Sequence, residues 1–175
     1  MNNRIDVLTD DDRWSAEIAD AEVWSERIFD EALSYLQKHS LDAGFGFERP
    51  ICVNLSLSND DEVRKLNREF RGKDKPTNVL SFANIDDEMF WQELETADEI
   101  ELGDIIVALE TLKREAAEKN IPLLHHFAHL LIHGILHLFG YDHQTDEEAE
   151  EMEHIEVMIL RQMGIDDPYE EQCNV

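Results

Sequence analysis

Hydrophobic residues recur at two spacings along this chain, and each spacing predicts a different element. Residues 14–38 repeat apolar side chains every three or four positions, from Trp14 through Ile28 to Leu36, which is typical of an amphipathic helix. Residues 51–58 alternate apolar with smaller or polar side chains, which predicts a half-buried strand. The same reasoning predicts further strands at 4–8, 77–83 and 102–108.

Capping residues place the remaining helices. Asn59 before Glu62, and Thr145 before Glu148, match the spacing of a capping box, in which a short polar side chain satisfies a free backbone N–H of the first turn. Helices are therefore expected at 59–70, 110–120, 122–139 and 145–164, and the acidic stretch 86–100 is expected to be a loop. This order of elements favours an α+β fold, a small mixed sheet with helices packed against one side of it.

Composition limits the class of protein. A length of 175 residues with 42% hydrophobic content favours a single domain, 1–175, with a substantial core. Cys52 and Cys173 lie far apart and are expected to be one buried thiol and one tail thiol. The N-terminus shows no basic-then-apolar leader, and no apolar run reaches the ~18 residues of a membrane span. We therefore expect a cytoplasmic protein without membrane contact.

The net charge of −26 predicts that the chain repels nucleic acid on average. The cations, however, are clustered. Six of the fifteen basic residues fall within one short segment, namely Arg64, Lys65, Arg68, Arg71, Lys73 and Lys75. This segment is either a local basic patch on an acidic body or a solvated helix face followed by a charged loop.

The most specific pattern is HGILHLFGYDH at residues 133–143. His133 and His137 are four residues apart on a predicted helix, so both rings project from one face and can reach one ion. Gly140 can reverse the chain, and His143 can then return to the same ion. Three imidazoles with an open fourth position are typical of a catalytic zinc site.

The spacing matches the metzincin zinc helix and turn, H-E-x-x-H-x-x-G-x-x-H, at all positions but one. Gly134 stands where that pattern has its glutamate, the general base of the peptidases. This difference argues against peptide hydrolysis by the usual route. His129, one turn before His133, is expected to be a hydrogen-bond partner of a ligand or a core residue. Asp142 is expected either to orient a ligand or a water, or to cap the turn.

Two further histidines, His125 and His126, are expected either at the surface or at the start of the same helix. Phe70 is expected to anchor the end of its helix in the core. The neighbouring Arg71 is expected either to face a cleft or to cap the last carbonyls of the helix at the surface.

Two motifs together resemble the YbeY family of bacterial endoribonucleases: HGILHLFGYDH at 133–143 and FRGKDKPTNVLSF at 70–82. LGDIIV at 102–107 and DDPY at 166–169 add to the resemblance, which covers residues 50–170. The resemblance implies one zinc ion per chain, bound by His133, His137 and His143, and a functional role for Arg71. It also implies maturation of the 3′ end of 16S ribosomal RNA and a part in ribosome quality control. The implied partners are ribosomal RNA, the small ribosomal subunit and its assembly factors, and not DNA.

These residues suit cleavage of a phosphodiester. Arg71 could neutralise the charge that develops on the phosphate, and Lys73 and Lys75 could hold flanking phosphates. The attacking group is a water activated by the metal or the RNA 2′-hydroxyl, and the general base is Asp142 or a water.

Two alternative functions stay open. A metallopeptidase-like hydrolase would need a carboxylate brought to the metal from elsewhere, and Gly134 speaks against it. A non-catalytic ribosome-binding module with a structural zinc would be favoured by a fourth protein ligand, for instance His129.

Overall fold

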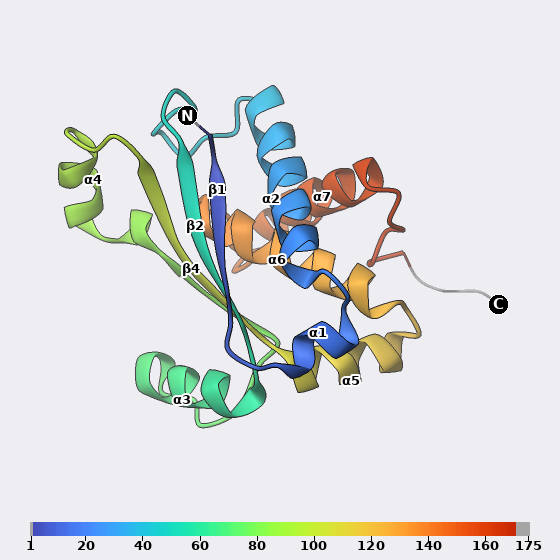
Figure 1. Cartoon of the computed structure of the whole chain (residues 1–175). Helices are drawn as coiled ribbons and strands as arrows, with labels where there is room; N and C mark the ends of the chain where they lie inside the picture. Colours follow the sequence, from blue (N-terminus) through green and yellow to red (C-terminus); the bar gives the residue numbers. More distant parts are fainter. Residues whose placement is uncertain (1, 171–175) are drawn as a thin grey trace.

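A four-stranded mixed sheet forms the centre of the molecule, as expected from the sequence (Figure 1). The structure is a computed structural model and describes residues 2–170. The strands are β1 (Arg4–Thr9), β2 (Ile51–Ser58), β3 (Val79–Ala83) and β4 (Ile100–Ala108). They lie in the order β1-β2-β4-β3; β3 is antiparallel to β4, and the other neighbours are parallel.

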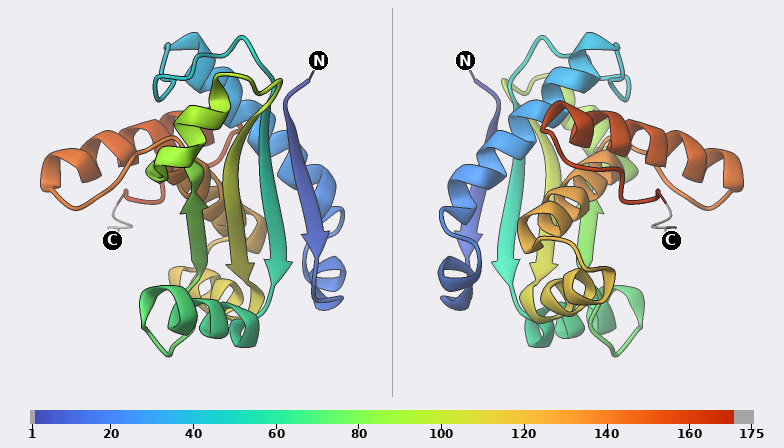
Figure 2. Two further views of the ribbon diagram at one scale, coloured as in Figure 1. Left: turned by 90° about the vertical axis from the view of Figure 1, so that its left-hand side faces the viewer. Right: turned by 90° about the vertical axis from the view of Figure 1, so that its right-hand side faces the viewer.

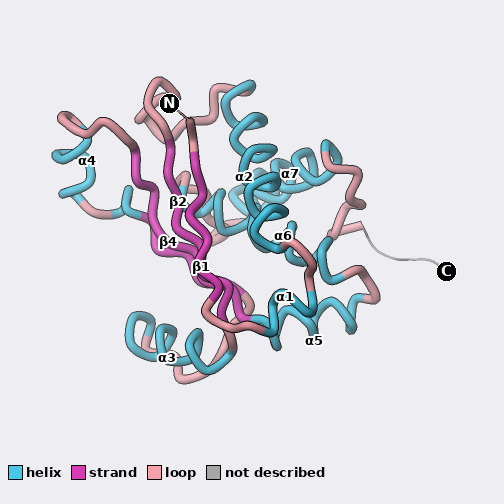
Figure 3. Tube along the Cα trace, viewed as in Figure 1, coloured by secondary structure: helices cyan, strands magenta, loops and turns pink. Residues whose placement is uncertain are grey.

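Seven α-helices accompany the sheet within residues 2–170 (Figure 3). They are α1 (Arg13–Glu17), α2 (Ala21–Lys38), α3 (Asp60–Arg71), α4 (Glu88–Leu94), α5 (Leu109–Lys119), α6 (Leu123–Leu138) and α7 (Asp146–Gln162). No single helix in this part of the chain is long and apolar enough to cross a membrane. Only α5 and α6 taken together, a pair bent by 117°, reach that length and composition.

Helix α6 lies at the centre of the packing. Together with α2 it covers one face of the sheet, and α7 lies across these two helices (Figure 2). Phe127, Ile132 and Leu136 of α6 are each 0% exposed. Burial of a side chain of this kind contributes about 1.5–3 kcal/mol, so α6 is held firmly on several sides. The histidines that it carries therefore start from a rigid element.

Helix α3 packs against the opposite face, so the expectation that the helices share one side of the sheet is wrong. Val63 of α3 is 0% exposed and forms a small apolar cluster with Leu80 of β3 and Ile106 of β4. Side chains alternate along a strand, so Leu80 and Ile106 face α3 while their neighbours face α6. Strand β4 is apolar on both faces in this region, and both faces therefore need a cover.

The helix predicted for residues 14–38 is in fact two helices, α1 and α2. The backbone leaves helical geometry at Ile18, with φ of −130°, and is left-handed at Asp20, with φ of 57°. Aspartate tolerates that conformation better than most residues. Trp14 accounts for the break, because its buried indole N–H donates to the carbonyl of Ser58 at the end of β2, over 2.8 Å. The break lets Trp14 dock there while α2 packs against α6.

The acidic stretch 86–100, expected to be a loop, contains α4 and the first residue of β4. Asp87 caps α4 by accepting from the backbone N–H of Met89, over 2.9 Å. Phe90 and Leu94, four residues apart, turn toward the core, and Leu94 is only 9% exposed. The many acidic neighbours hid this short apolar pair in the sequence.

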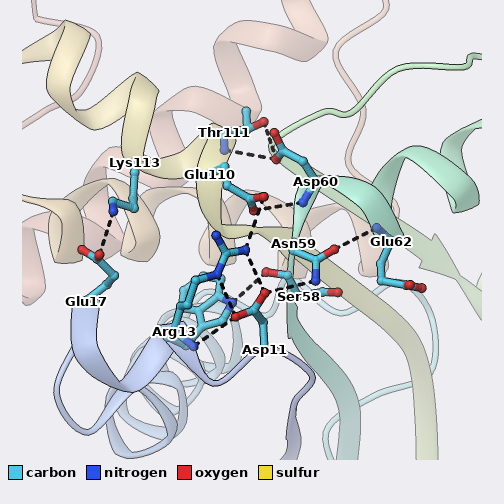
Figure 4. A network of polar contacts seen from close by, with 11 residues as sticks. Asp11, Arg13, Glu17, Ser58, Asn59, Asp60, Glu62, Glu110, Thr111 and Lys113 are labelled. Carbon is cyan, nitrogen blue, oxygen red and sulfur yellow. Dashed lines mark hydrogen bonds and ion pairs between the residues drawn. The ribbon is translucent and has the colours of Figure 1, made fainter.

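Helices α3 and α5 cap each other (Figure 4). The Asp60 carboxylate of α3 accepts from the backbone N–H of Thr111 over 3.1 Å and from its hydroxyl over 2.7 Å. In return, the Glu110 carboxylate of α5 accepts from the backbone N–H of Asp60 over 3.1 Å. Asn59 caps α3 as expected. Each such cap contributes about 0.5–2 kcal/mol, and together the caps fix where α3 runs across the sheet.

Candidate metal centre and nucleic-acid cleft

Three histidines meet at the C-terminal end of α6. The Nε2 atoms of His133 and His137, one helical turn apart, lie 3.0 Å from each other. The helix ends at Leu138, and Gly140 takes a φ of 95°, which turns the chain back. This turn brings His143 to the pair, so that one nitrogen of each ring lies within 4.8 Å of the other two. The three rings can therefore bind a single metal ion.

The hydrogen bonds behind the rings determine which nitrogen faces the shared point. His137 Nδ1 lies 2.8 Å from the carbonyl oxygen of Tyr141, which can only accept, so Nδ1 carries the proton. His133 Nδ1 lies 2.7 Å from the carboxylate of Glu156 and carries a proton for the same reason. In the neutral rings, two Nε2 lone pairs then face each other across 3.0 Å, which is unfavourable unless a cation lies between them. The residues present therefore fit a metal ion.

The surroundings of the site also favour the neutral, metal-binding form of the ligands. Burial, and next the neighbouring His133, lower the pKa of His137 below its ordinary value. His133 is 21% exposed, whereas His143 is more exposed and stands at the rim. The site is thus closed by α6 on one side and open on the other, as a catalytic metal site requires.

Glu156 of α7, which the sequence analysis did not identify, is a fully buried carboxylate beneath these ligands. One oxygen accepts from His133 and the other from His129, each over 2.7 Å. Burial opposes ionisation, but these hydrogen bonds outweigh it and lower the pKa of Glu156 to about 2. A signal was present in the sequence, because Glu156 falls between Ile155 and Ile159 on the apolar face of α7, where an unpaired glutamate is rarely found.

Tyr169 completes this network from the segment that follows α7. Its hydroxyl donates to Glu156 over 2.5 Å and lies 2.9 Å from His129 Nε2. Burial, and next the charge of Glu156, raise the pKa of Tyr169 far above its ordinary value, so the hydroxyl keeps its proton. His129 is thus joined to His133 through Glu156 and does not belong to the group of nitrogens that surround the ion position.

Asp142 uses its carboxylate locally. Its Oδ1 accepts from the backbone N–H of His143 over 2.8 Å, which is the turn-capping role considered for it. Asp142 also lines the same cleft as the three histidines. It can therefore hold the turn that carries His143 and still present an oxygen to the cleft.

Gly134 shows why the peptidase glutamate is missing here. It lies on the face of α6 that packs against the sheet, where an added Cβ would lie 3.1 Å from Cγ2 of Ile105 and 3.2 Å from Oγ of Ser81. A larger side chain would crowd these two neighbours, which would have to shift by a few tenths of an ångström. Position 134 therefore serves close helix–sheet packing, and its side chain supplies no carboxylate for a general base.

A cleft of about 710 Å³ opens in front of the histidines. The three rings and Asp142 line it, together with the end of α3, the loop that follows α3 and strand β3. Arg71, Lys73 and Lys75 line the same cleft. The structure thus brings together candidate residues from two motifs that lie about sixty positions apart in the sequence.

These three cations have no carboxylate partner within 4.0 Å in the described part of the chain. Other cations of segment 64–75 pair with acidic neighbours, as Arg64 does with Asp74 over 2.8 Å and Lys65 with Glu62 over 3.2 Å. The segment therefore divides into a paired surface face and three unpaired cations that line the cleft. Both readings of the basic segment hold, each for a part of it.

Arg71 is the last residue of α3, and Gly72 ends the helix with a φ of 68°. One guanidinium nitrogen donates to the carbonyl of Ser81 in β3 over 2.9 Å, and the guanidinium carbon lies 5.6 Å from the centre of the Phe82 ring. These contacts orient the guanidinium and leave its other N–H groups for a ligand. Asn67 of α3 donates to the carbonyl of Lys75 over 2.8 Å, which holds the loop after α3 against the helix.

One sequence expectation about this region is wrong. Phe70 is 64% exposed and lies edge-on to Phe82 at 5.6 Å, because the last turn of α3 has only the edge strand β3 beneath it.

Of the two positions expected for His126, the structure has the helix start and not the surface. His126 lies in the first turn of α6 and is 1% exposed. Its Nε2 lies 2.9 Å from the carboxylate of Glu115 on α5, which also accepts from Asn78. Burial lowers the pKa of His126 despite the hydrogen bond to Glu115. Of the two cysteines, Cys52 is buried as expected, and Cys173 lies outside the described residues.

Comparisons with known proteins point to one family. The family model described as endoribonuclease YbeY matches residues 10–164. A protein of that name from Rhizorhabdus wittichii is 47% identical over 158 residues, which cover 86% of this chain and 90% of that protein. Another from Allorhizobium ampelinum is 40% identical over 173 residues, which cover 98% of this chain and 97% of that protein.

The fold has a counterpart among solved structures. The solution structure of TM1509 from Thermotoga maritima matches with a TM-score of 0.55 and covers 98% of this chain and 99% of its own. At 23% identity this likeness supports the fold alone. The matched family model and the two relatives span most of the chain, including both the histidine segment and the segment around Arg71. The chain belongs to the YbeY family.

Proposed function

We propose that this protein is a zinc-dependent endoribonuclease that cleaves single-stranded RNA. The names of its relatives supply the class of reaction. The observation that carries the proposal is the cleft, which three clustered imidazoles line together with Arg71, Lys73 and Lys75. In a chain of net charge −26, cations left without acidic partners favour an anionic ligand, and an RNA phosphodiester is such a ligand.

The residues of the cleft suit an in-line displacement on phosphorus. Negative charge builds up on the phosphate oxygens during that step, and the guanidinium of Arg71 can neutralise it with two parallel N–H bonds. Lys73 and Lys75 hold flanking phosphates as point charges. A zinc ion bound at the three histidines supplies Lewis acidity toward a phosphate oxygen and lowers the pKa of a coordinated water. Asp142 presents a carboxylate oxygen that can accept the proton of the attacking group.

We assign this activity to ribosome maturation in the cytoplasm. The single domain would process the 3′ end of 16S ribosomal RNA and take part in quality control of the small subunit, alongside its assembly factors. The support is membership of the YbeY family together with the two motifs, at 70–82 and 133–143, that form the walls of the cleft.

Neither alternative function gains a favourable observation. Position 134 holds a glycine packed closely against Ile105 and Ser81, so it supplies no base for a peptidase. A structural zinc would need a fourth ligand, and His129 is engaged by Glu156 and Tyr169 instead.

The test combines metal analysis with RNA cleavage. The purified protein should contain about one zinc per chain, and removal of the metal by a chelator should abolish cleavage of a single-stranded 16S 3′ precursor until zinc is restored. His143→Ala should lose both zinc and cleavage, because one of the three metal ligands is removed. The variant should still fold, because His143 is exposed and its removal does not disturb the core. His125→Ala, on the same helix but outside the cleft, is the control. A zinc-free enzyme that cleaves at the full rate would contradict the proposal.

The termini of the products identify the attacking group. Attack by the 2′-hydroxyl leaves a 2′,3′-cyclic phosphate on the upstream fragment, whereas attack by water leaves an ordinary phosphomonoester. This measurement decides between the two routes that the cleft allows.

A further inference from the structure

A buried carboxylate links the metal centre to the segment that follows α7. Glu156 is 0% exposed, and both of its oxygens are used. One lies 2.7 Å from His133 Nδ1; the other lies 2.7 Å from His129 Nε2 and 2.5 Å from the hydroxyl of Tyr169. Three donors surround this carboxylate, and in the described part of the chain its charged partners are limited to the two histidines. Burying such a carboxylate costs free energy, which suggests that its geometry is used.

We propose that Glu156 is a positioning residue for metal binding, and that Tyr169 couples the C-terminal segment to the metal centre through it. This inference rests on the proposed metal site but concerns two residues outside its three ligands. Under this proposal, α7 and the segment from its end to Tyr169 help to set the metal affinity.

The first step of the argument is the orientation of His133. Since a carboxylate only accepts, Glu156 keeps the proton of His133 on Nδ1 and directs the Nε2 lone pair toward the ion position. His137 receives the same orientation from the backbone carbonyl of Tyr141, which no side-chain substitution removes. Of the two ligands on α6, His133 is therefore the one whose orientation depends on a replaceable side chain.

The second step concerns the other oxygen of Glu156. His129 and Tyr169 both donate to it, so an amide in place of the carboxylate would turn an N–H₂ group toward at least one donor. Glutamine at position 156 has the right size but cannot satisfy all three partners. The ring of His133 would then lose a fixed tautomer, or the contact with Tyr169 would break.

The third step concerns the C-terminal segment. Tyr169 lies seven positions beyond the end of α7 at Gln162, and 42% of it is exposed, yet its hydroxyl reaches a fully buried carboxylate. Its ring also lies edge-on to the ring of His129, at 5.2 Å between centres. These contacts hold the segment against Glu156 and His129. Loss of the contacts should therefore change the orientation of His133, the ligand that Glu156 holds.

The chain supplies a matched control. Glu115 of α5 lies 2.9 Å from His126. His126 is on α6, the helix that carries His133 and His137, but it is not among the three clustered histidines. Glu115→Gln therefore repeats the chemical change of Glu156→Gln, a carboxylate that loses its charge beside a buried histidine. A general effect of weakened packing would appear in both variants, and an effect on metal positioning only in one.

The experiment measures zinc affinity by chelator competition on the metal-free full-length protein, with thermal unfolding of each variant alongside. Glu156→Gln should bind zinc about 10- to 100-fold more weakly than wild type, the usual cost of losing a partner of a metal-bound histidine. Tyr169→Phe should shift affinity in the same direction by a smaller factor, and Glu115→Gln should leave it unchanged. In the metal-free wild type, ¹⁵N NMR should show His133 protonated on Nδ1, with both tautomers in Glu156→Gln.

Each outcome decides a separate claim. Wild-type zinc affinity in Glu156→Gln would overturn the positioning role, and wild-type affinity in Tyr169→Phe would overturn the coupling to the C-terminal segment. Equal losses in Glu156→Gln and Glu115→Gln would show a packing effect and also overturn the role. If Glu156→Gln does not fold, Tyr169→Phe, which removes a single hydroxyl, carries the test. A wild-type protein that binds no zinc would instead refute the proposed metal centre itself.

Discussion

Replacing Arg71 with alanine distinguishes an enzyme from an RNA-binding protein. In the free protein, Arg71 makes one hydrogen bond, to the carbonyl of Ser81, and one contact with the ring of Phe82. Each contributes about 0.5–1 kcal/mol at an exposed position, so the free energy of unfolding should fall by about 1–2 kcal/mol. The protein should fold and retain its zinc, because the described interactions of Arg71 are with Ser81 and Phe82 and not with the three histidines.

The expected loss of activity is larger than the loss of stability. Removing a donor aimed at the charge of the transition state typically slows a reaction about 100- to 1,000-fold, or about 2.7–4 kcal/mol. Arg71→Lys should recover only part of this rate, because an ammonium group cannot form two parallel N–H bonds to a phosphate. The two effects can therefore be measured separately.

The assay is single-turnover cleavage of single-stranded RNA with the enzyme in saturating excess, at two salt concentrations. Arg64→Ala is the control, since Arg64 lies on the same helix but pairs with Asp74 and does not line the cleft. This control should weaken binding in a salt-dependent manner and leave the saturated rate unchanged. If Arg71→Ala cleaves saturating RNA at the wild-type rate, the catalytic role of Arg71 is wrong, and a binding module becomes the better description.

Three further predictions follow from the same structure. Zinc affinity should hold near pH 7 and fall below pH ~6.5, where protons compete for the ligand nitrogens. Because the pKa of His137 is lowered, this ligand stays neutral to a lower pH than an exposed histidine would; an affinity that does not change between pH 7.5 and 5 would rule out histidine ligation. Gly134→Glu should lower the free energy of unfolding by about 1–3 kcal/mol through crowding against Ile105, and should create no peptidase activity; thermal unfolding and a peptide-cleavage assay measure the two. Burial raises the pKa of the Cys52 thiol to about 11, so in a Cys173→Ser background alkylation at pH 7.5 should be at least ~100-fold slower than for a free cysteine and should accelerate toward pH 10; rapid labelling at pH 7.5 would show that the thiol is accessible.

The periodicity of single elements was enough to predict the sheet and most helices. The alternation along 51–58 reports burial directly, and β2 occupies those residues. Relations between elements were not readable in the same way. The break after α1 depends on where Trp14 meets Ser58, and the exposure of Phe70 depends on where the sheet ends beneath α3. Both features depend on how two elements pack against each other, and the hydrophobic pattern within one element does not predict that packing.

The same distinction holds at the site. His133, His137 and His143 fall within eleven residues, so helix geometry and one glycine turn suffice to group them. Arg71 lies on another element and was singled out only through the family resemblance. Glu156 lies 23 positions beyond His133 and was missed, because its partner is decided by how α7 crosses α6.

Gly134, at the position of the peptidase glutamate, and Arg71 both lie against Ser81 of β3. At Gly134, helix α6 approaches the sheet so closely that a Cβ would lie 3.2 Å from Oγ of Ser81. The carbonyl of that same Ser81 accepts the hydrogen bond of Arg71. Close packing at Gly134 therefore brings the strand that holds the guanidinium up to the histidines. Three clustered histidines of peptidase spacing thus share a cleft with three cations, and a phosphate is a ligand that such a cleft can bind.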